Sequence, residues 1–222
     1  MKIVIAGAGE VGTHLAKMLS QENQDIILMD PNEERLKFTN NMEVLAMVGN
    51  PTSLKDLQES GIKDADLFIS VTPEEPTNIT ACMLAHSLGA HKTLARINNY
   101  EYLQPKNIEF FQKLGISSMI YPEMLAAREI VTAVQRPWAR QYWELFGGAL
   151  ILIGVKVRDN APIVNKRLTD LSLDQKLYHI VAIKRCNETI IPRGTDHIAS
   201  GDIVFFTTTR EHVKEVQIQT GK

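Results

Sequence analysis

The sequence predicts an α/β fold in which a Rossmann-like doubly wound parallel sheet is followed by a small α+β C-terminal module. Three observations carry this prediction. Short apolar runs alternate with segments of helical periodicity over residues 1–121. The first apolar run is followed at once by a glycine-rich turn. From about residue 149 the chain consists mainly of β-rich runs separated by turn residues.

The length and composition restrict the possible classes of protein. The chain has 222 residues, which favours two modest domains over one. A formal net charge of -2 gives no basic excess of the kind that favours nucleic acid. No apolar run approaches the roughly 20 residues of a membrane-spanning helix, so we expect no direct insertion into a membrane. Cys82 and Cys186 form no CxxC motif, which favours reduced thiols in a cytosolic protein.

The parallel sheet is expected to contain six strands. Ile3, Val4 and Ile5 are consecutive apolar residues, as in a strand that is covered on both faces. Further short apolar runs have the same character. The expected strands are residues 2–6, 25–30, 44–48, 66–71, 92–97 and 118–121.

Helical segments separate these strands. Residues 11–19 carry apolar side chains at i, i+4, i+7 and i+8, which form one stripe of a helix. Pro76 suits the start of a later helix because its missing N–H would have no partner there. The expected helices are residues 11–19, 33–40, 52–61, 77–88, 105–114 and 122–135.

A change of composition marks the domain boundary. Pro137 breaks the last helix, and a pair of glycines closes the segment that follows it. We expect a nucleotide-binding domain over 1–121, a crossover helix and connector over 122–148, and a C-terminal module over 149–222. Four aromatic residues of the connector either anchor a partner subunit or tie the two domains together. They are Trp138, Tyr142, Trp143 and Phe146.

The turn Gly7-Ala8-Gly9-Glu10-Val11-Gly12 matches the GxGxxG pattern of dinucleotide-binding sites. In that pattern Gly7 permits the turn, Gly9 lets the backbone approach a pyrophosphate, and Gly12 lets helix and strand pack closely. Phosphates are favoured at the N–H groups of the following helix. Asp30 stands 18 residues after Gly12, close to the spacing of a carboxylate that binds ribose hydroxyls. Alternatively, the glycines serve packing alone and Asp30 caps the next helix.

Three further strand ends would border the same crevice. Asn50 is expected either to bind the adenine edge or to shape a turn, and Val71 and Thr72 to cover the adenine or ribose. Arg96 is expected to pair with a phosphate or with a partner subunit, or to be a plain surface residue. The carboxylate of Asp30 would repel a 2′-phosphate, so NAD(H) or another adenine nucleotide is favoured over NADP(H).

The sequence supplies no clear catalytic apparatus. An NAD-dependent oxidoreductase needs a substrate pocket and usually a positioned acid–base group. The histidines of the C-terminal module, His179, His197 and His212, stand singly, and we expect no catalytic residue. Cys82 and His86 share a helical stripe with apolar residues, which favours core packing over metal binding. A binding protein is therefore favoured over an enzyme.

Nine short motifs cover nearly the whole chain. They are Gly7–Gly12, Asp30–Arg35, Val48–Asn50, Ala65–Thr72, Asn78–Cys82, Ala95–Ile97, Tyr121–Glu123, Ile191–Gly194 and Gly201–Phe206. In this order they resemble the RCK (regulator of potassium conductance) domain family, and in particular the Trk-type potassium-uptake regulatory subunits of the TrkA family.

The resemblance implies a cytoplasmic regulatory subunit that docks on a membrane potassium transporter of Trk type. It implies a homodimer or a larger gating ring that binds NAD(H), ADP or ATP. It also implies that residues 7–12 hold phosphates, that Asp30 holds the ribose, and that Val71, Thr72 and Arg96 line the rest of the site. In some relatives the position of Glu123 binds a cation near the subunit interface, which makes Glu123 a weak metal candidate.

The chain departs from the family pattern at some positions. Some relatives have an arginine in the glycine loop that serves a terminal phosphate, whereas this chain has Glu10. A carboxylate is unfavourable near a triphosphate, so NAD(H) or ADP gains over ATP. Many relatives contain two such halves in tandem, and we expect this chain to be the first half of a longer protein. The C-terminal module is an alternative site for sensing another small ligand.

Overall fold

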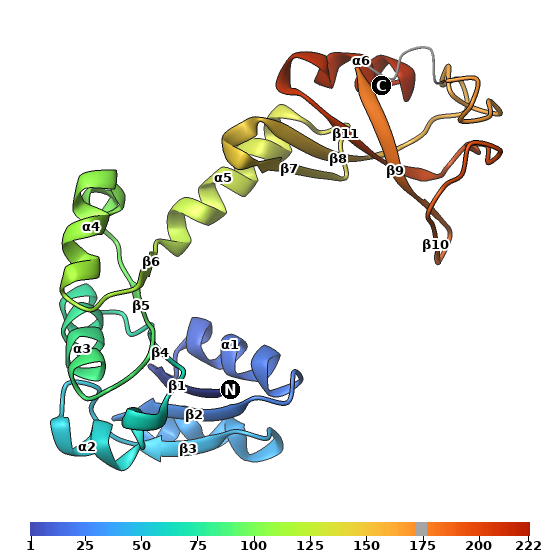
Figure 1. Ribbon diagram of the computed structural model, residues 1–222. Helices are drawn as coiled ribbons and strands as arrows, with labels where there is room; N and C mark the ends of the chain where they lie inside the picture. The colour runs from blue at the N-terminus through green and yellow to red at the C-terminus, as the bar shows by residue number, and fades with distance from the viewer. Residues whose placement is uncertain (172–176) are drawn as a thin grey trace. The chain divides into compact units, whose positions relative to one another are not determined.

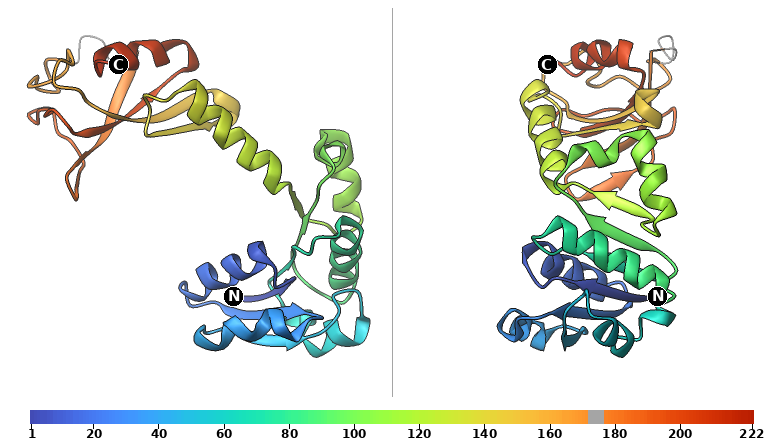
Figure 2. Two further views of the ribbon diagram at one scale, coloured as in Figure 1. Left: turned by 180° about the vertical axis from the view of Figure 1, so that it is seen from behind. Right: turned by 90° about the vertical axis from the view of Figure 1, so that its left-hand side faces the viewer.

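The computed structural model describes residues 1–171 and 177–222, without the side chains of residues 38, 40 and 41. The chain forms two compact units, Met1–Ala126 and Ala127–Lys222 (Figure 1). The first unit contains a parallel sheet with helices on both faces, and the second contains an antiparallel sheet (Figure 2). The predicted fold class is therefore confirmed. None of the helices in the described part of the chain is long and apolar enough to cross a membrane.

The sheet of the first unit has the strand order β3-β2-β1-β4-β5-β6, and the order reverses between β1 and β4. Its strands are β1 (Lys2–Ala6), β2 (Asp25–Asp30), β3 (Leu45–Val48), β4 (Leu67–Ser70), β5 (Thr93–Arg96) and β6 (Ser118–Ile120). Its helices are α1 (Glu10–Ser20), α2 (Leu54–Glu59), α3 (Glu75–Ser87), α4 (Pro105–Lys113) and the start of α5 (Pro122–Gln135), with 3-10 helices at Glu33–Asn41, Ile62–Asp64 and Tyr100–Leu103. In such sheets ligands bind beyond the carboxyl ends of the strands, where the order reverses.

The strand β1 supplies the core on both faces of this sheet, because successive side chains of a strand point to opposite sides. Ile3 and Ile5 pack in the cluster that includes Ala16 of α1. Val4 packs in the hydrophobic cluster on the opposite face of the sheet, which contains residues of α2, α3 and α4. In that second cluster Cys82 is fully buried, and burial raises the pKa of its thiol to about 12. Cys82 is thus a core residue, whereas Cys186 is exposed.

The sheet of the second unit is antiparallel, with the strand order β10-β9-β11-β8-β7. One face is buried against α6, where Val216 is fully covered. The strands are β7 (Gln141–Leu145), β8 (Leu150–Lys156), β9 (Tyr178–Arg185), β10 (Glu188–Ile190) and β11 (Ile203–Thr208), and the helices are α6 (Val213–Gln219) and 3-10 turns at Phe146–Gly148 and Arg210–His212.

The edge strand β7 lies within residues 122–148, and the sequence pattern does not predict it. The strand pairs with β8 through Tyr142 opposite Ile153 and Trp143 opposite Leu152. The segment is too short and too rich in polar residues to stand out by periodicity. Its aromatic residues, which favour strands, were the available signal. Trp138 and Tyr142 pack against the core of the second unit, so part of the aromatic segment belongs to this unit rather than to a free connector.

An ion pair with a buried carboxylate fixes the loop before β11. The carboxylate of Asp202 is 2% exposed and accepts hydrogen bonds from Nε and Nη2 of Arg185, at 3.0 and 2.8 Å. It also accepts one from the backbone N–H of Ala199, at 2.8 Å. Burial opposes ionisation, but the hydrogen bonds from Arg185 and Ala199 outweigh it and hold the pKa of Asp202 below its ordinary value. The ionised form therefore stabilises the folded module.

We predict that Asp202→Asn lowers the stability of the protein by about 1–3 kcal/mol at neutral pH, because the N–H donors around it lose a charged acceptor. The contribution of Asp202 is complete above the ordinary carboxyl pKa of 3.8 and is lost as the pH falls through the lower folded value. Thermal unfolding at neutral pH and at about pH 3 should therefore show a difference between wild type and variant that shrinks on acidification. The exposed Asp170→Asn serves as the control, and an equal loss in both variants would contradict the assignment.

Candidate functional site

The glycine loop between β1 and α1 is held by two close backbone contacts. Gly7 has a φ of +104°, and a Cβ built on it would lie 3.0 Å from the backbone nitrogen of Thr72. A Cβ on Gly12 would lie 1.8 Å from the carbonyl oxygen of Gly7. Both positions therefore need glycine for the chain to turn and for α1 to approach β1.

Gly9 differs from the other two glycines of the motif. It is the N-cap of α1, its φ of -81° is accessible to any residue, and a Cβ built on it would meet no protein atom within 4 Å. No side chain caps the helix, so the N–H groups at its start have no side-chain acceptor. A glycine here leaves room for a phosphate to approach backbone donors and the positive end of the helix dipole.

Glu10 opens the first turn of α1 and lies in solvent. Its side chain is 95% exposed, and its Oε2 is 3.8 Å from Nδ1 of His14 one turn further along. Val11 is also exposed, at 38%. Of the six residues of the motif, these two present side chains to solvent, whereas the side chain of Ala8 is buried.

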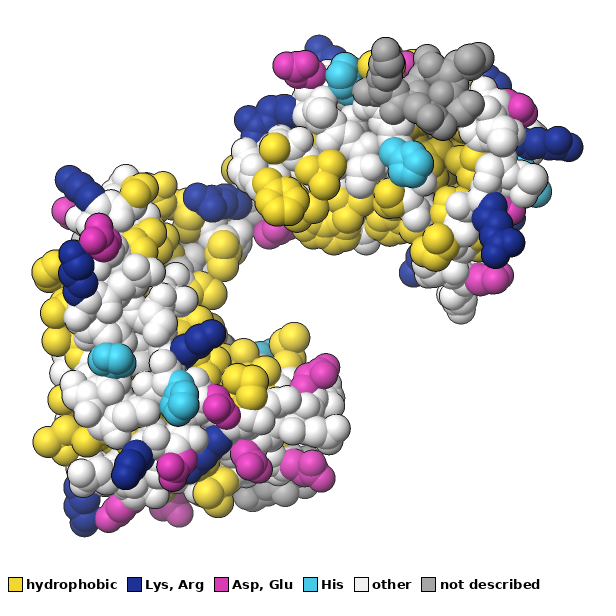
Figure 3. Space-filling view, viewed as in Figure 1, with side chains coloured by type: hydrophobic (Ala, Val, Ile, Leu, Met, Phe, Trp, Pro, Cys, Tyr) yellow, Lys and Arg dark blue, Asp and Glu magenta, His cyan; other side chains and the backbone are white. Residues whose placement is uncertain are grey.

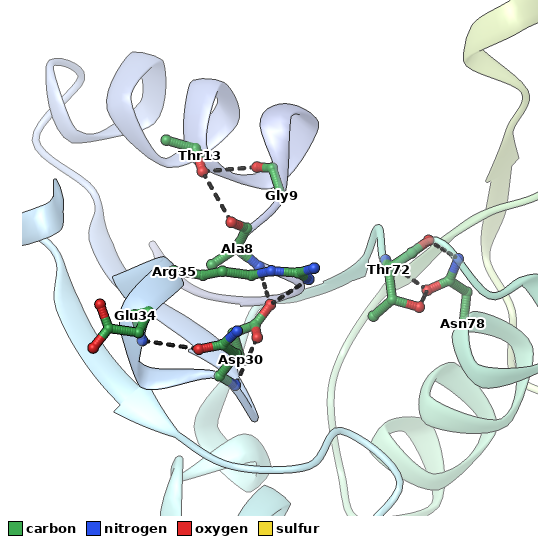
Figure 4. A network of polar contacts seen from close by, with 9 residues as sticks. Ala8, Gly9, Thr13, Asp30, Glu34, Arg35, Thr72 and Asn78 are labelled. Carbon is green, nitrogen blue, oxygen red and sulfur yellow. Dashed lines mark hydrogen bonds and ion pairs between the residues drawn. The ribbon is translucent and has the colours of Figure 1, made fainter. Parts of the chain in front are cut away.

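Asp30, the last residue of β2, is 2% exposed and faces the glycine loop (Figure 4). Its Oδ2 accepts a hydrogen bond from the N–H of Ala8, and its Oδ1 accepts one from the N–H of Asn32, each at 2.8 Å. A carboxylate offers about four lone-pair sites, so two remain after these bonds. Asp30 thus fixes the loop and retains capacity for hydroxyl donors. The guanidinium of Arg35 lies beside it, with Nη1 3.9 Å from Oδ2.

Val71 and Thr72 follow β4 and lie next to the glycine loop, but they do different things. Val71 is 5% exposed, and its Cγ2 lies 3.3 Å from the position of a Cβ on Gly12. Its side chain therefore packs beneath the loop. Thr72 is half-buried and presents its backbone to Gly7, while its hydroxyl donates to Asn78 at 2.7 Å.

Asn78, on α3, organises this edge of the sheet, although the sequence pattern predicts no site role for it. The residue is 1% exposed (Figure 4). Its Oδ1 accepts hydrogen bonds from the hydroxyl of Ser70 and from both the N–H and the hydroxyl of Thr72, at 2.7–2.9 Å. Its Nδ2 donates to the carbonyls of Thr72 and Arg96, each at 3.0 Å. One buried amide therefore joins the ends of β4 and β5 to α3. In the sequence, the signal for this role was a polar residue, Asn78, on the buried face of a predicted helix.

Asn50 follows β3 and serves a turn. Its Oδ1 accepts hydrogen bonds from the N–H and the hydroxyl of Thr52, at 3.0 and 2.8 Å. Its own N–H donates to Oδ2 of Asp56 at 2.7 Å. The carbonyl side of the amide is thus engaged in the loop, and the exposed Nδ2 is the part of this side chain that faces solvent.

Arg96 ends β5 and pairs with Glu123, the second residue of α5. Nη2 of Arg96 lies 2.6 Å from Oε1 of Glu123, and the two side chains are 26% and 52% exposed. The pKa of Glu123 is lowered, first by its own backbone N–H at the helix start and further by Arg96. The carboxylate of Glu123, which the family resemblance makes a weak metal candidate, thus faces a guanidinium. Among the described residues, no group of three or more His, Cys, Asp or Glu side chains is arranged to hold a metal ion.

These residues fit an adenine dinucleotide or a nucleoside diphosphate. Phosphates would lie over Gly9 and the first turn of α1, and the ribose diol would reach Asp30. The geometry brings together the glycine loop, Asp30 and Thr72, whereas Val71 lies under the loop and Asn50 in a separate turn. The fold and this arrangement of residues define a Rossmann-type unit with a candidate nucleotide site, joined to a β-rich module.

Comparison with known proteins assigns the chain to a family. Residues 3–122 match the TrkA-N domain and residues 152–218 match the TrkA-C domain. The chain belongs to the TrkA family, as the resemblance of its motifs indicated. This is a family of regulatory, non-enzymatic subunits, which agrees with the absence of a predicted catalytic residue.

One relative and two solved structures illustrate the similarity. The Trk system potassium uptake protein TrkA of Halomonas elongata is 34% identical over 97% of this chain and 48% of its own length. The GsuK channel bound to NAD has a TM-score of 0.62 at 16% identity, over 100% of this chain and 39% of that chain. GsuK bound to ADP has a TM-score of 0.50 at 21% identity, over 61% and 34%. The chain spans about half the length of the curated relatives it matches.

We predict that Gly12→Ala and Gly9→Ala differ sharply in stability. The methyl group on residue 12 would overlap the carbonyl of Gly7, and overpacking of this kind typically costs about 1–3 kcal/mol or more. The methyl group on residue 9 enters open space, so only the weaker capping preference of alanine remains, at most about 1 kcal/mol. Chemical denaturation of the two variants measures the difference. Equal stability would mean that the loop does not pack as described.

Proposed function

We propose that this chain is the nucleotide-sensing regulatory part of a potassium uptake system. In this proposal residues 1–121 bind NAD(H) or ADP, and the bound ligand gates a membrane potassium transporter of Trk type. The observation that carries the proposal is the pairing of an open glycine, Gly9, with the carboxylate of Asp30 at one edge of the sheet. Membership of the TrkA family supports the link to potassium uptake.

The charges of the crevice support NAD(H) and ADP over the alternatives. The carboxylate of Asp30 disfavours a 2′-phosphate, which argues against NADP(H). Glu10 adds a negative charge at the start of α1, where a terminal phosphate would lie, and this argues against ATP. Solved structures of the related GsuK fold carry NAD or ADP in their names, which is consistent with either ligand.

A regulatory role requires assembly as well as binding, because a ligand shifts an equilibrium only by its different affinity for two states. We propose a homodimer, or a gating ring of such dimers, formed through α5. No residue of α5 is buried, and four of its apolar side chains are exposed by about half or more. They are Leu125 (47%), Ile130 (64%), Val131 (51%) and Val134 (74%).

Further hydrophobic side chains reach the surface of the second unit near β7 (Figure 3). Trp143 is 46% exposed and Phe146 is 86% exposed. Such residues anchor protein interfaces when a partner covers them. Docking on a transporter would place the protein in the cytoplasm at the inner face of the cell membrane, as a peripheral subunit.

A second candidate function is sensing of another small ligand by the second unit. A cavity of about 380 Å³ there is lined by residues before β9, by β9 itself and by the turn after β10. Tyr178, His179 and Arg193 give it both aromatic and polar groups. Ligand pockets in proteins usually have volumes of this order.

We predict that Asp30→Ala weakens binding of NADH and ADP by about tenfold or more, because the ribose loses a charged acceptor. Isothermal titration calorimetry measures the affinity, and thermal unfolding verifies that the variant is folded. Asp25→Ala is the matched control, since Asp25 is exposed at the opposite end of the same strand. Unchanged affinity in Asp30→Ala would show that the nucleotide does not bind beside Asp30. Binding that involves the second unit instead would survive this substitution.

We predict that Ile130→Glu converts the protein from a dimer to a monomer at micromolar concentration, because it places a charge on the apolar surface of α5. Sedimentation velocity measures the change. Ile218→Glu is the control, because Ile218 is 58% exposed on α6, away from α5 in the sequence. A wild-type monomer, or a dimer that both variants retain, would contradict assembly through α5.

A further inference from the structure

The second unit contains a hollow of about 500 Å³ where the end of β8 meets the turn before β11 and the segment after α6. It is lined by residues 156–160, 200–201 and 222, and we call it the basic hollow. Its volume is in the range of ligand pockets in proteins. It shares no residue with the cavity lined by Tyr178 and His179, so it is a separate feature of this unit.

Backbone hydrogen bonds hold the three segments around the basic hollow. The N–H of Gly201 donates to the carbonyl of Val157 at 3.0 Å, and the N–H of Val157 donates to the carbonyl of Asp202 at 2.8 Å. The N–H of Arg158 donates to the carbonyl of Thr220 at 3.3 Å. The positions of the lining residues are therefore set by the fold of the unit, and they do not depend on side-chain contacts alone.

Four basic side chains gather at this place. Lys156, Arg158 and Lys222 line the hollow, and Arg140 lies close enough for its charge to act on Lys222. Burial lowers the pKa of Lys222, and the positive charges of the other three residues lower it further. In the part of the chain that the structure describes, none of the four forms an ion pair with an acid. Their mutual repulsion would be relieved by a bound anion.

The other polar groups of the lining are compatible with an anion. Asp159 is the one acid that lines the hollow, and its carboxylate accepts a hydrogen bond from the hydroxyl of Ser200. The turn around Asp159 and Asn160 is closed by the N–H of Ala161, which donates to the carbonyl of Arg158 at 3.0 Å. Among the described residues, the N–H groups of Asp159 and Asn160 have no acceptor. The lining therefore combines three cations and two unused N–H donors with a single carboxylate.

The positive charge belongs to this unit and not to the whole chain. Residues 127–222 contain 14 Lys and Arg against 10 Asp and Glu, which gives a net charge of +4, whereas the whole chain has a net charge of -2. A hollow lined by charges of one sign attracts ions of the opposite sign. An anion is thus attracted both by the unit as a whole and by the side chains of the basic hollow.

We infer that the basic hollow binds a phosphate group, carried either by a free small molecule or by a phosphomonoester lipid headgroup. The three cations and one carboxylate of the lining have a net charge of +2. A phosphate monoester carries a charge of about -1.5 to -2 at neutral pH, so it matches this charge better than a single carboxylate would. Lysine and arginine side chains both bind phosphate oxygens through charged N–H donors. The inference does not depend on nucleotide binding by the first unit.

The test is calorimetric titration of the 222-residue chain with inorganic pyrophosphate, with NADH in excess so that the glycine loop does not contribute. Lys156→Gln and Arg158→Gln should each weaken binding about tenfold, as expected for loss of a charged hydrogen bond. Asp159→Asn should instead tighten binding several-fold, because it removes the negative charge and keeps an oxygen acceptor for Ser200. The three substituted residues are exposed, and thermal unfolding verifies that the variants are folded.

The second arm replaces pyrophosphate by vesicles of phosphatidylcholine with or without phosphatidic acid, and measures sedimentation of the protein with the vesicles. Binding of pyrophosphate that depends on Lys156 and Arg158 supports a free ligand. Binding to the phosphatidic acid vesicles alone, with the same dependence, supports a lipid headgroup.

Lys214→Gln is the matched control, because Lys214 is exposed on α6 of the same unit and does not line the basic hollow. An equal loss of binding in this variant would show a general effect of charge and would overturn the inference. The inference is also overturned if neither probe binds, or if binding survives both Lys156→Gln and Arg158→Gln. Failure of the chain to bind NADH or ADP would contradict the proposed function and would leave this inference standing.

Discussion

The site depends on the approach of α1 to the turn after β1, where the backbone of Gly12 meets the carbonyl of Gly7. No side chain fits between them, so the start of α1 is brought to the carboxyl edge of the sheet, where no side chain caps it. Asp30 then connects β2 to the same turn through the N–H of Ala8. The start of α1, the glycine loop and Asp30 are therefore held together by direct contacts, so a shift of one would shift the others.

The candidate site combines an uncharged buried frame with charged groups at its edge. Asn78 holds the ends of β4 and β5 with an uncharged amide whose oxygen and nitrogen are both satisfied inside the protein. Such a network is rigid and pays no penalty for a buried charge. Arg35 and Arg96 lie at the rim, each next to a carboxylate and each partly exposed. The strand ends are thus held by a buried uncharged group, whereas the two guanidinium groups are partly exposed.

Much of this arrangement was predictable from the sequence, and the parts that were not have physical reasons. The glycine spacing and the acid at the end of the second apolar run define the site locally, because each acts through its own backbone position. The role of Asn78 depends on two strands and a helix meeting in space, so a local pattern can mark it as a polar residue on a buried helix face but cannot name its partners. The strand β7 exists because β8 offers an edge to pair with, and the pairing of Arg96 with Glu123 depends on β5 and β6 lying side by side.

The contrast between the two cysteines has a practical consequence. Cys82 is buried with a strongly raised pKa, so its thiol is neither ionised nor accessible under ordinary conditions. Cys186 is exposed in the turn between β9 and β10. A maleimide dye or spin label would thus attach at one native position in the second unit without any engineered cysteine. That single label would report on the second unit while the candidate nucleotide site, in the first, remains unlabelled.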